Sequence, residues 1–230
     1  YIGYSPEDVP NLEKTNGIVP PWDPNASQGA SLTDTRKYMQ TVAGIDDNVE
    51  ALLAKLDERE DVRENTVVIY LSDQGLFRNE HGLGDKRAAY EESIRIPFII
   101  RYPGIQTSHA DVEEIALNLD LAPTILDLAD VEIPDSMQGR SLKPFVEDAT
   151  AVPANWRTSF LFTYNYDQEF PQGGVPEFIA IRNENGDKFI HYPENGDWDE
   201  LFTGDDPYEI NNRIDDPAYA GLLADLRMKL

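Results

Sequence analysis

A polar loop between two apolar stretches carries the side chains of this sequence that are best suited to chemistry. The apolar run Thr66–Leu71 predicts a buried strand, and Asp73 and Gln74 lie just past its end, after Ser72. Both side chains offer oxygen atoms, the donors that Ca²⁺ and Mg²⁺ prefer, at the end of a strand where α/β sheets bind ligands. His81 and Lys86 follow in the same loop, and a lysine supplies a compact positive charge for a tetrahedral anion. The loop therefore predicts a site for a hard cation and an oxyanion.

Each of these residues also has a purely structural interpretation. An Asp-Gln-Gly sequence after a strand commonly forms a turn in which Asp73 bonds to its own backbone. An isolated lysine such as Lys86 is commonly solvated. His81 could touch a substrate or orient a ligand, but packing behind the site is an equal alternative. Only the order and spacing of the whole segment favour the functional interpretation.

The segment from residue 66 to residue 104 resembles the formylglycine-dependent sulfatases of the alkaline phosphatase superfamily. The matching patterns are S-D-x-G, E-H-G-L-x-x-K-R and Y-E-E-S-I-R-I-P-F-I-I, with E-L-x-x-x-x-D-P-Y-E-x-N-N as a second match within residues 199–212. The resemblance implies that Asp73 and Gln74 ligate Ca²⁺, with Mg²⁺ as an alternative, and that Lys86 holds the sulfate group. Gln74 departs from the His or Asn usual in the family, although its amide oxygen can still ligate calcium.

The nucleophile of this family has no counterpart in the sequence. The family's formylglycine is made from the Cys or Ser of a C/S-x-P-x-R motif, and the chain contains no cysteine and no serine in that frame. The resemblance therefore implies the C-terminal half of a sulfuric ester hydrolase that acts on a sulfate ester and is inactive alone. Two alternatives stay open: a non-catalytic sulfatase-like binding or structural domain, and a portion of a phosphonate or phosphodiester hydrolase of the same superfamily.

The predicted fold class is α/β. The resemblance implies part of an alkaline phosphatase-like sandwich, with a central mixed sheet flanked by helices, over residues 1–150. A small C-terminal antiparallel sheet with a helix is expected over residues 151–230. Residues 1–30 are rich in Pro, Asn and Gly and predict an irregular loop. Helices are predicted from Ser31 or Thr33 to residue 56, from Asn118 or Asp120 to 128 and over 217–230; strands over 66–71, 97–102, 111–118, 158–164, 177–182, 188–192 and 199–203; and a hairpin turn at 183–187.

Other polar residues invite functional interpretations that their context does not favour. Asp46 and Asp47 are helix neighbours that diverge by about 100°, so they do not easily face one ion and are expected to be solvated or capping. Arg140 follows a glycine and is expected to bind carbonyl groups. The remaining candidates are interpreted as follows: Asp205, Asp206 and Glu209 as a turn and helix-start device, His191 as half-exposed on a strand, and His109 as a loop residue.

Charge and composition limit the partners. The 230 residues include 43 acidic and 19 basic side chains, a net charge of −24, which argues against binding nucleic acid or an anionic membrane. No apolar run approaches the roughly 20 residues of a membrane span. A domain without its N-terminal strands should expose sheet edges and apolar surface, so we expect pairing with a missing N-terminal half or self-association. The family resemblance implies a periplasmic or secreted location.

Overall fold

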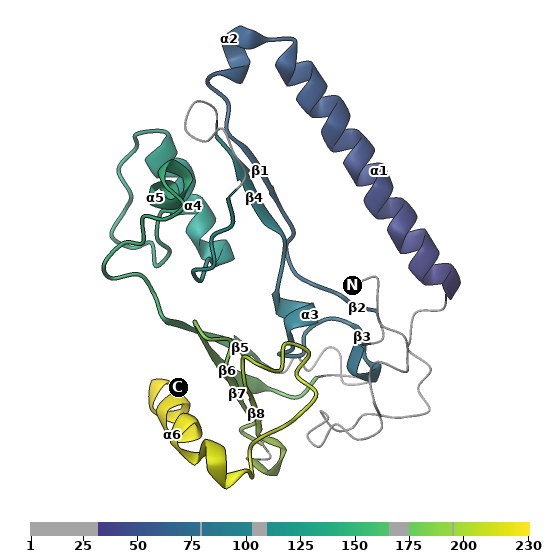
Figure 1. The fold of residues 1–230 in the computed structure, drawn as a ribbon, viewed down its shortest axis with the longest axis vertical. Helices are drawn as coiled ribbons and strands as arrows, with labels where there is room; N and C mark the ends of the chain where they lie inside the picture. Colours follow the sequence, from purple (N-terminus) through teal and green to yellow (C-terminus); the bar gives the residue numbers. More distant parts are fainter. Residues whose placement is uncertain (1–31, 79, 103–109, 166–174, 195) are drawn as a thin grey trace. The chain divides into compact units, whose positions relative to one another are not determined.

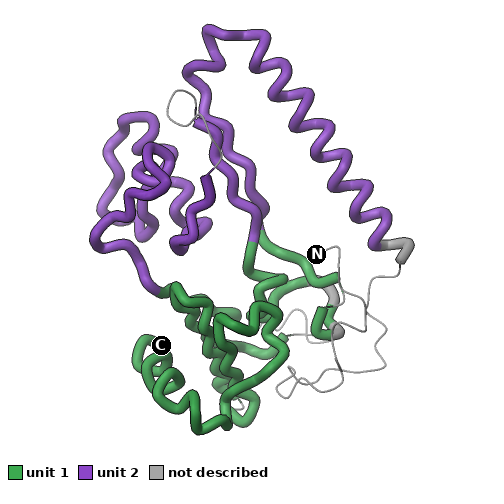
Figure 2. Tube along the Cα trace, viewed as in Figure 1, with its two compact units in different colours: residues 1–33, 74–95, 159–230 green, residues 34–73, 96–158 purple. Residues whose placement is uncertain are grey.

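The chain forms two compact units in the computed structural model (Figure 2). We call residues 34–73 and 96–158 the ribbon unit, and residues 74–95 with the described part of 159–230 the sheet unit. The structure describes residues 32–78, 80–102, 110–165, 175–194 and 196–230. The predicted N-terminal loop, Ser31 and His109 lie outside these ranges.

The ribbon unit is built on a two-stranded antiparallel ribbon (Figure 1). Val68 pairs with Arg101 and Leu71 pairs with Phe98, so both strands predicted from the apolar runs are confirmed. The predicted long helix and the helix ending at residue 128 are also confirmed. The unit's elements are α1 (Leu32–Asp57), α2 (Glu60–Arg63), β1 (Val68–Leu71), β4 (Phe98–Arg101), the 3₁₀ turn Asn118–Asp120, α4 (Leu121–Leu128) and α5 (Lys143–Glu147).

The strand predicted over residues 111–118 is wrong. These residues form an irregular stretch that ends in a 3₁₀ turn. Their backbone groups bond to side chains instead of to a neighbouring strand: the Ile115 carbonyl accepts from Trp156 Nε1 and Arg157 Nη1, both at 3.0 Å. The Leu117 amide donates to Asp120 Oδ2 at 2.8 Å. Side chains thus pair two backbone groups that would otherwise be available to a neighbouring strand.

A buried carboxylate holds the C-terminal half of the ribbon unit together. Asp120 is fully buried and pairs with the Arg157 guanidinium through both oxygens, at 2.5 and 2.6 Å. The same carboxylate accepts from the backbone amides of Leu117 and Arg140 at 2.8 Å. The Arg140 guanidinium donates to the carbonyl of Asn155, which confirms its predicted role.

The sheet unit contains a four-stranded antiparallel sheet in the order β5-β6-β7-β8. All four strands were predicted, as were the turn at 183–187 and the closing helix; the Asn183 amide donates to the Asp187 carbonyl at 2.9 Å. The elements are β2 (Phe77–Arg78), the 3₁₀ turn Glu80–Gly82, β3 (Gly84–Asp85), α3 (Glu91–Ile94), β5 (Ser159–Tyr164), β6 (Phe178–Asn183), β7 (Lys188–His191), the 3₁₀ turn Gly196–Trp198, β8 (Glu200–Phe202), the 3₁₀ turn Pro217–Tyr219 and α6 (Ala220–Lys229).

Two apolar layers cover the two faces of this sheet. Alternate residues of a strand point to opposite faces, and Ile181, Phe189 and Leu201 pack against Leu226 of α6. The opposite face packs against residues 74–95, which we call the motif segment. The buried residues of this layer are Phe77, Ala88, Ala89, Tyr90, Phe178, Ala180, Ile190, Tyr192 and Phe202. The loop that was predicted to bind the cation and the oxyanion therefore packs against the C-terminal sheet. Among the described residues, no helix is long and apolar enough to cross a membrane.

Candidate functional site

The predicted metal donors occupy the end of β1. Asp73 is exposed and Gln74 is half-buried, and the Ser72 hydroxyl donates to Asp73 Oδ1 at 3.4 Å. The strand that was predicted to present them is present, so the oxygen donors do follow a strand's carboxyl end. Within the part of the chain that the structure describes, no group of three or more His, Cys, Asp or Glu side chains could hold a metal ion. Asp73 and Gln74 suit a hard cation but supply two of the about six to eight oxygens that calcium takes.

Gly75 fixes the turn after Gln74 against α3. Its amide donates to the Ser93 carbonyl at 2.8 Å. A Cβ atom at Gly75 would lie 2.0 Å from the carbonyl oxygen of Glu92, a distance that no side chain tolerates. A glycine is therefore required for this close approach of two backbones.

The corner that carries Lys86 is fixed to the same helix. Lys86 is half-buried and directly follows β3. The next residue, Arg87, has a φ of 93°, a conformation that is costly for a side-chain-bearing residue. Its amide donates to the Ser93 hydroxyl at 2.9 Å. Ser93 therefore accepts two hydrogen bonds from the loop. Its carbonyl binds the amide of Gly75, which follows Gln74, and its hydroxyl binds the amide of Arg87, which follows Lys86.

His81 supports this loop from within the core. Its side chain is 5% exposed, and its backbone φ is 54°. The ring stacks on Tyr90 with centroids 4.1 Å apart, and Nε2 lies 3.3 Å from Glu92 Oε2. These contacts are those of a ring packed behind the site. A substrate contact by His81 remains a prediction.

A buried ionic cluster beneath α3 was missed by the sequence analysis. Lys188 is fully buried, and its Nζ lies 2.8 Å from Glu91 Oε1 and 2.5 Å from Glu209 Oε1. It also donates to the Ala89 carbonyl at 2.9 Å. Arg182 Nε lies 2.9 Å from the same Glu91 oxygen. The available signal was a lysine at an inward-facing position of an otherwise apolar strand.

The prediction for Glu209 needs correction. The Asp205–Glu209 stretch does contain a turn, closed by the Glu209 amide bonding to the Asp206 carbonyl at 2.9 Å, but among the described residues no helix begins there. The Glu209 side chain is buried, and its Oε2 accepts from the Glu91 amide at 2.8 Å. By contrast, Asp46 and Asp47 are exposed and His191 is half-exposed, as expected.

The pKa values of the two glutamates in this cluster shift in opposite directions. Burial raises the pKa of Glu91, but the charges of Lys188 and Arg182 outweigh it and hold that pKa below its usual value. Burial raises the pKa of Glu209, and the single cation Lys188 only partly offsets it. The difference follows from the two cations beside Glu91 and from the charge of Glu91 itself, which further raises the pKa of Glu209.

A second buried carboxyl lies nearby between two tyrosines. Glu200 accepts from the Tyr90 hydroxyl at 2.8 Å and from the Tyr192 hydroxyl at 2.9 Å. Burial raises the pKa of Glu200 to about 8, although both hydrogen bonds oppose the shift. Burial also raises the pKa of both tyrosines. Tyr90 thus connects the motif segment to β8 through a polar as well as an apolar contact.

Comparison with known protein families gives two overlapping matches. The family model described as Sulfatase matches residues 2–131, which is more than half of the chain. The chain belongs to the sulfatase family. A second model, described as N-sulphoglucosamine sulphohydrolase, C-terminal, matches residues 79–230 of this sulfatase-family chain. The match confirms the resemblance that the motifs of residues 66–104 indicated.

Curated relatives of this sulfatase-family chain are much longer. An N-acetylglucosamine-6-O-sulfatase of Bacteroides thetaiotaomicron is 40% identical over 187 residues, which cover 80% of this chain and 33% of the relative. The human N-acetylglucosamine-6-sulfatase is 37% identical over 131 residues, or 56% of this chain and 23% of the relative. The chain thus spans about a third or less of these relatives and covers only part of the sulfatase domain.

Solved structures confirm the fold. The chain is similar, with a TM-score of 0.78 and 38% identity, to a protein solved in complex with its substrate D-glucosamine-2-N,6-O-disulfate; the match covers 86% of this chain and 39% of that one. A phosphonate monoester hydrolase from Silicibacter pomeroyi matches with a TM-score of 0.65 and 26% identity, covering 80% of this chain and 37% of its own. The α/β fold of this sulfatase-family chain is that of the alkaline phosphatase-like proteins, as predicted.

Proposed function

We propose that this chain contributes the sulfate-binding lysine and part of the metal site to a sulfuric ester hydrolase. Lys86 binds the sulfate group, and Asp73 and Gln74 ligate a cation. The observation that carries the proposal is that Ser93 fixes both the turn beside Gln74 and the corner beside Lys86, within a segment that the Sulfatase family model matches. Pre-positioned cations of this kind stabilise charge on a tetrahedral anion.

The cation in this proposal is Ca²⁺, with Mg²⁺ as the alternative. The donors are a carboxylate and an amide, which hard cations prefer to softer metals. When bound, the cation would neutralise part of the charge on the sulfate oxygens. The chain contains no cysteine, and we infer that a formylglycine nucleophile and the other metal ligands belong to an upstream part of the sulfatase domain. His81 holds Tyr90 and the loop behind Lys86.

The proposed substrate class is a 6-O-sulfated glucosamine. The relative that is 40% identical is named an N-acetylglucosamine-6-O-sulfatase, and the similar solved structure holds a glucosamine disulfate. A phosphonate monoester is the second candidate, because a solved phosphonate monoester hydrolase shares the fold at 26% identity. A lysine and a divalent cation can stabilise either tetrahedral anion, so the two candidates are separated by assay.

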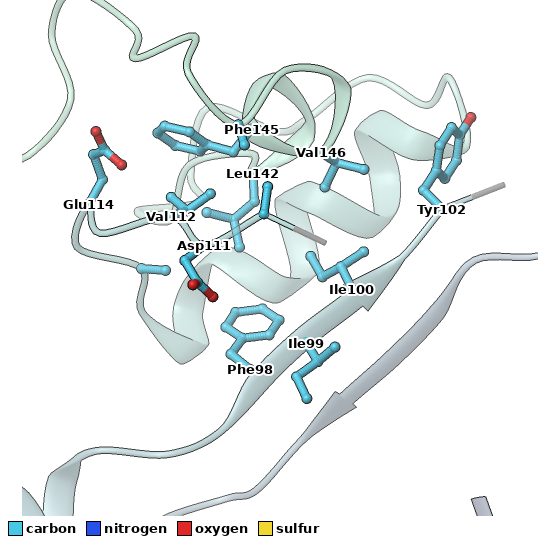
Figure 3. Close-up of a pocket in the computed structure, with 13 residues that line it drawn as sticks. Phe98, Ile99, Ile100, Tyr102, Asp111, Val112, Glu114, Leu142, Phe145 and Val146 are labelled. Carbon is cyan, nitrogen blue, oxygen red and sulfur yellow. The ribbon is translucent and has the colours of Figure 1, made fainter. Parts of the chain in front are cut away.

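The proposed partner is the upstream part of the sulfatase domain, which would cover exposed apolar surface of the ribbon unit. Tyr70 and Ile99 are paired in the ribbon and are 37% and 59% exposed. The other face of β4 borders a cavity of about 330 Å³, lined mainly by apolar side chains that include Phe98, Ile100 and Phe145 (Figure 3). The apolar stripe of α1 is also exposed at Tyr38, Met39, Val42, Ile45 and Leu52. Exposed apolar side chains that gather on one unit commonly mark an interface with another protein surface.

The test joins this chain to the upstream part of its Bacteroides relative and measures hydrolysis of N-acetylglucosamine 6-sulfate, an aryl sulfate and a phenyl phosphonate with added Ca²⁺. The chain alone should show no turnover, whereas the chimera should hydrolyse the sulfate esters. Lys86→Ala should lower kcat/KM of the chimera by at least about a hundredfold, because one lost charge contact in a dry site is worth about 3 kcal/mol.

Lys229→Ala is the matched control, since Lys229 is exposed and its ammonium group pairs with Asp225 of the same helix, α6, at 2.8 Å. Its kcat/KM should equal that of the parent chimera. Full activity of Lys86→Ala would refute the sulfate-binding role. Faster hydrolysis of the phosphonate would select the second candidate. A folded chimera that binds Ca²⁺ but turns over none of the three substrates would support a non-catalytic domain.

A further inference from the structure

The cluster of Lys188, Glu91 and Glu209 connects the C-terminal sheet to α3. The candidate site is in turn hydrogen-bonded to α3. Ser93 of α3 accepts the Gly75 amide through its carbonyl and the Arg87 amide through its hydroxyl. Glu91, the first residue of α3, is held by Lys188 from β7 and by Glu209 from the loop after β8. The chain of contacts therefore runs from the C-terminal sheet through α3 to both halves of the site.

Nothing within α3 itself fixes its position. The helix has four residues, and Tyr90 at its N-cap makes no capping hydrogen bond through its side chain. One isolated helical turn is unstable in water. The Glu91 amide, which a helix start leaves without an internal partner, donates instead to the Glu209 carboxylate. Lys188 neutralises that carboxylate and also bonds to the Ala89 carbonyl.

We propose that Lys188 and Glu209 are positioning residues that hold Gln74 and Lys86 in place through Glu91 and Ser93. The small C-terminal sheet is then part of the working site and not a separate appendage. The roles of Gln74 and Lys86 as ligands rest on the function proposed above. The mechanical link from Lys188 to Ser93 rests only on the contacts of the sheet unit.

Hydrogen exchange of two backbone amides in the 230-residue chain tests the link. The amides of Gly75 and Arg87 both end on Ser93, so they report whether α3 stays in place. Lys188→Met leaves two buried carboxylates without their shared cation, and we expect both amides to exchange at least about tenfold faster. Arg157→Met removes a comparably buried ion pair from the ribbon unit and should leave both amides unchanged.

Glu209→Gln provides a milder second variant, because the amide keeps an oxygen for the Glu91 backbone but loses the charge facing Lys188. It should speed exchange of the same two amides by a smaller factor. If Lys188→Met does not fold, this variant decides the question. Unchanged exchange at Gly75 and Arg87 in a folded variant would refute the proposal, as would an equal acceleration in Arg157→Met.

Sulfate binding separates this proposal from the one on which it rests. The side-chain resonances of Lys86 and Gln74 are followed by NMR while inorganic sulfate and Ca²⁺ are added to the chimera described above and to its Lys188→Met variant. We expect the apparent Kd for sulfate to rise at least about fivefold in the variant. No response in the unsubstituted chimera would refute the proposed function, whereas equal affinities in the two proteins would refute the positioning role.

Discussion

Among the single residues, Glu200 stands out because it retains its proton at neutral pH. Burial disfavours the charged form of its carboxyl group. The carboxyl group lies between the hydroxyls of Tyr90 and Tyr192, and its pKa of about 8 compares with a model-peptide value of 4.5. A neutral carboxyl can donate one hydrogen bond as well as accept others. The polar contacts that link β8 to Tyr90 and to Tyr192 are therefore made by an uncharged carboxyl group at neutral pH.

The Glu200 carboxyl should make the free energy of unfolding depend on pH. Its folded pKa is raised, so the folded protein binds more protons than the unfolded chain between pH 4.5 and 8. Its contribution is full below pH 4.5, falls by at most about 1.4 kcal/mol per pH unit across that window, and levels off above pH 8. Chemical denaturation at several pH values should show this slope as the difference between the parent chain and Glu200→Gln.

Glu200→Gln keeps an uncharged side chain of the same size, so its folded state should not depend on this titration. Equal pH profiles for the parent chain and the variant would contradict the assignment. Because Gln retains a carbonyl oxygen and a donor group, the variant should match the stability of the parent chain near pH 4.5. A large loss there would indicate a packing defect instead of a lost titration.

At the scale of elements, α3 joins parts of the chain that are distant in sequence. The Ser93 carbonyl of this helix accepts a hydrogen bond from the Gly75 amide, and the Glu91 amide donates one to the Glu209 carboxylate. Tyr90 packs against Phe202 of β8 with centroids 5.9 Å apart, and the His81 ring stacks on it. A short helix with this many neighbours owes its position to tertiary contacts and not to helix propensity.

Gly75→Ala should displace α3 and lower stability. The added methyl group would lie 2.0 Å from a backbone carbonyl of α3, and backbone cannot move aside as a flexible side chain can. We expect a loss of about 2 kcal/mol or more, measured by urea denaturation. Gly44→Ala in α1 is the matched control, since nothing lies within 4 Å of its Cβ position. It should gain up to about 1 kcal/mol, and equal effects at both glycines would contradict the close approach.

For the molecule as a whole, surface charge and exposed apolar area have opposite effects on self-association. The net charge of −24 keeps copies of the chain apart. The ribbon unit nevertheless exposes Leu52 and Ile99 at 59% each. The chain spans about a third of its Bacteroides relative, and an upstream part of the domain is the cover that we propose for this surface.

Without that cover, the chain should associate with itself, more strongly as salt screens its charge. Light scattering at 0.1 M and 1 M salt should show a mean mass above 25.9 kDa that rises with salt. Ile99→Ser should reduce the association at least about threefold, because it removes exposed apolar area. Leu161→Ser, at a position 48% exposed in the sheet unit, is the matched control and should have little effect. A monomer at both salt concentrations would contradict the exposed surface.

Local patterns in the sequence were enough to predict most of the elements and the family. Alternating and helical apolar patterns predicted α1, α4, α6 and six of the strands, because the period of burial is a local property. The motifs within residues 66–104 and 199–212 indicated the sulfatase family through the order and spacing of their residues. The strand predicted over 111–118 failed because its Ile115 carbonyl bonds to Trp156 and Arg157, which are about 40 residues away and which no local pattern could link to it.

The contacts that hold the candidate site could not be predicted, because they join residues that are distant in sequence. Lys188 is 97 residues after Glu91 and 21 before Glu209, and no local pattern links the three. Glu209 looked like a turn residue because its neighbours are turn formers, yet its side chain is buried on Lys188. Buried charges must be paired or neutralised, and which partner neutralises them depends on how β7, α3 and the loop after β8 pack together.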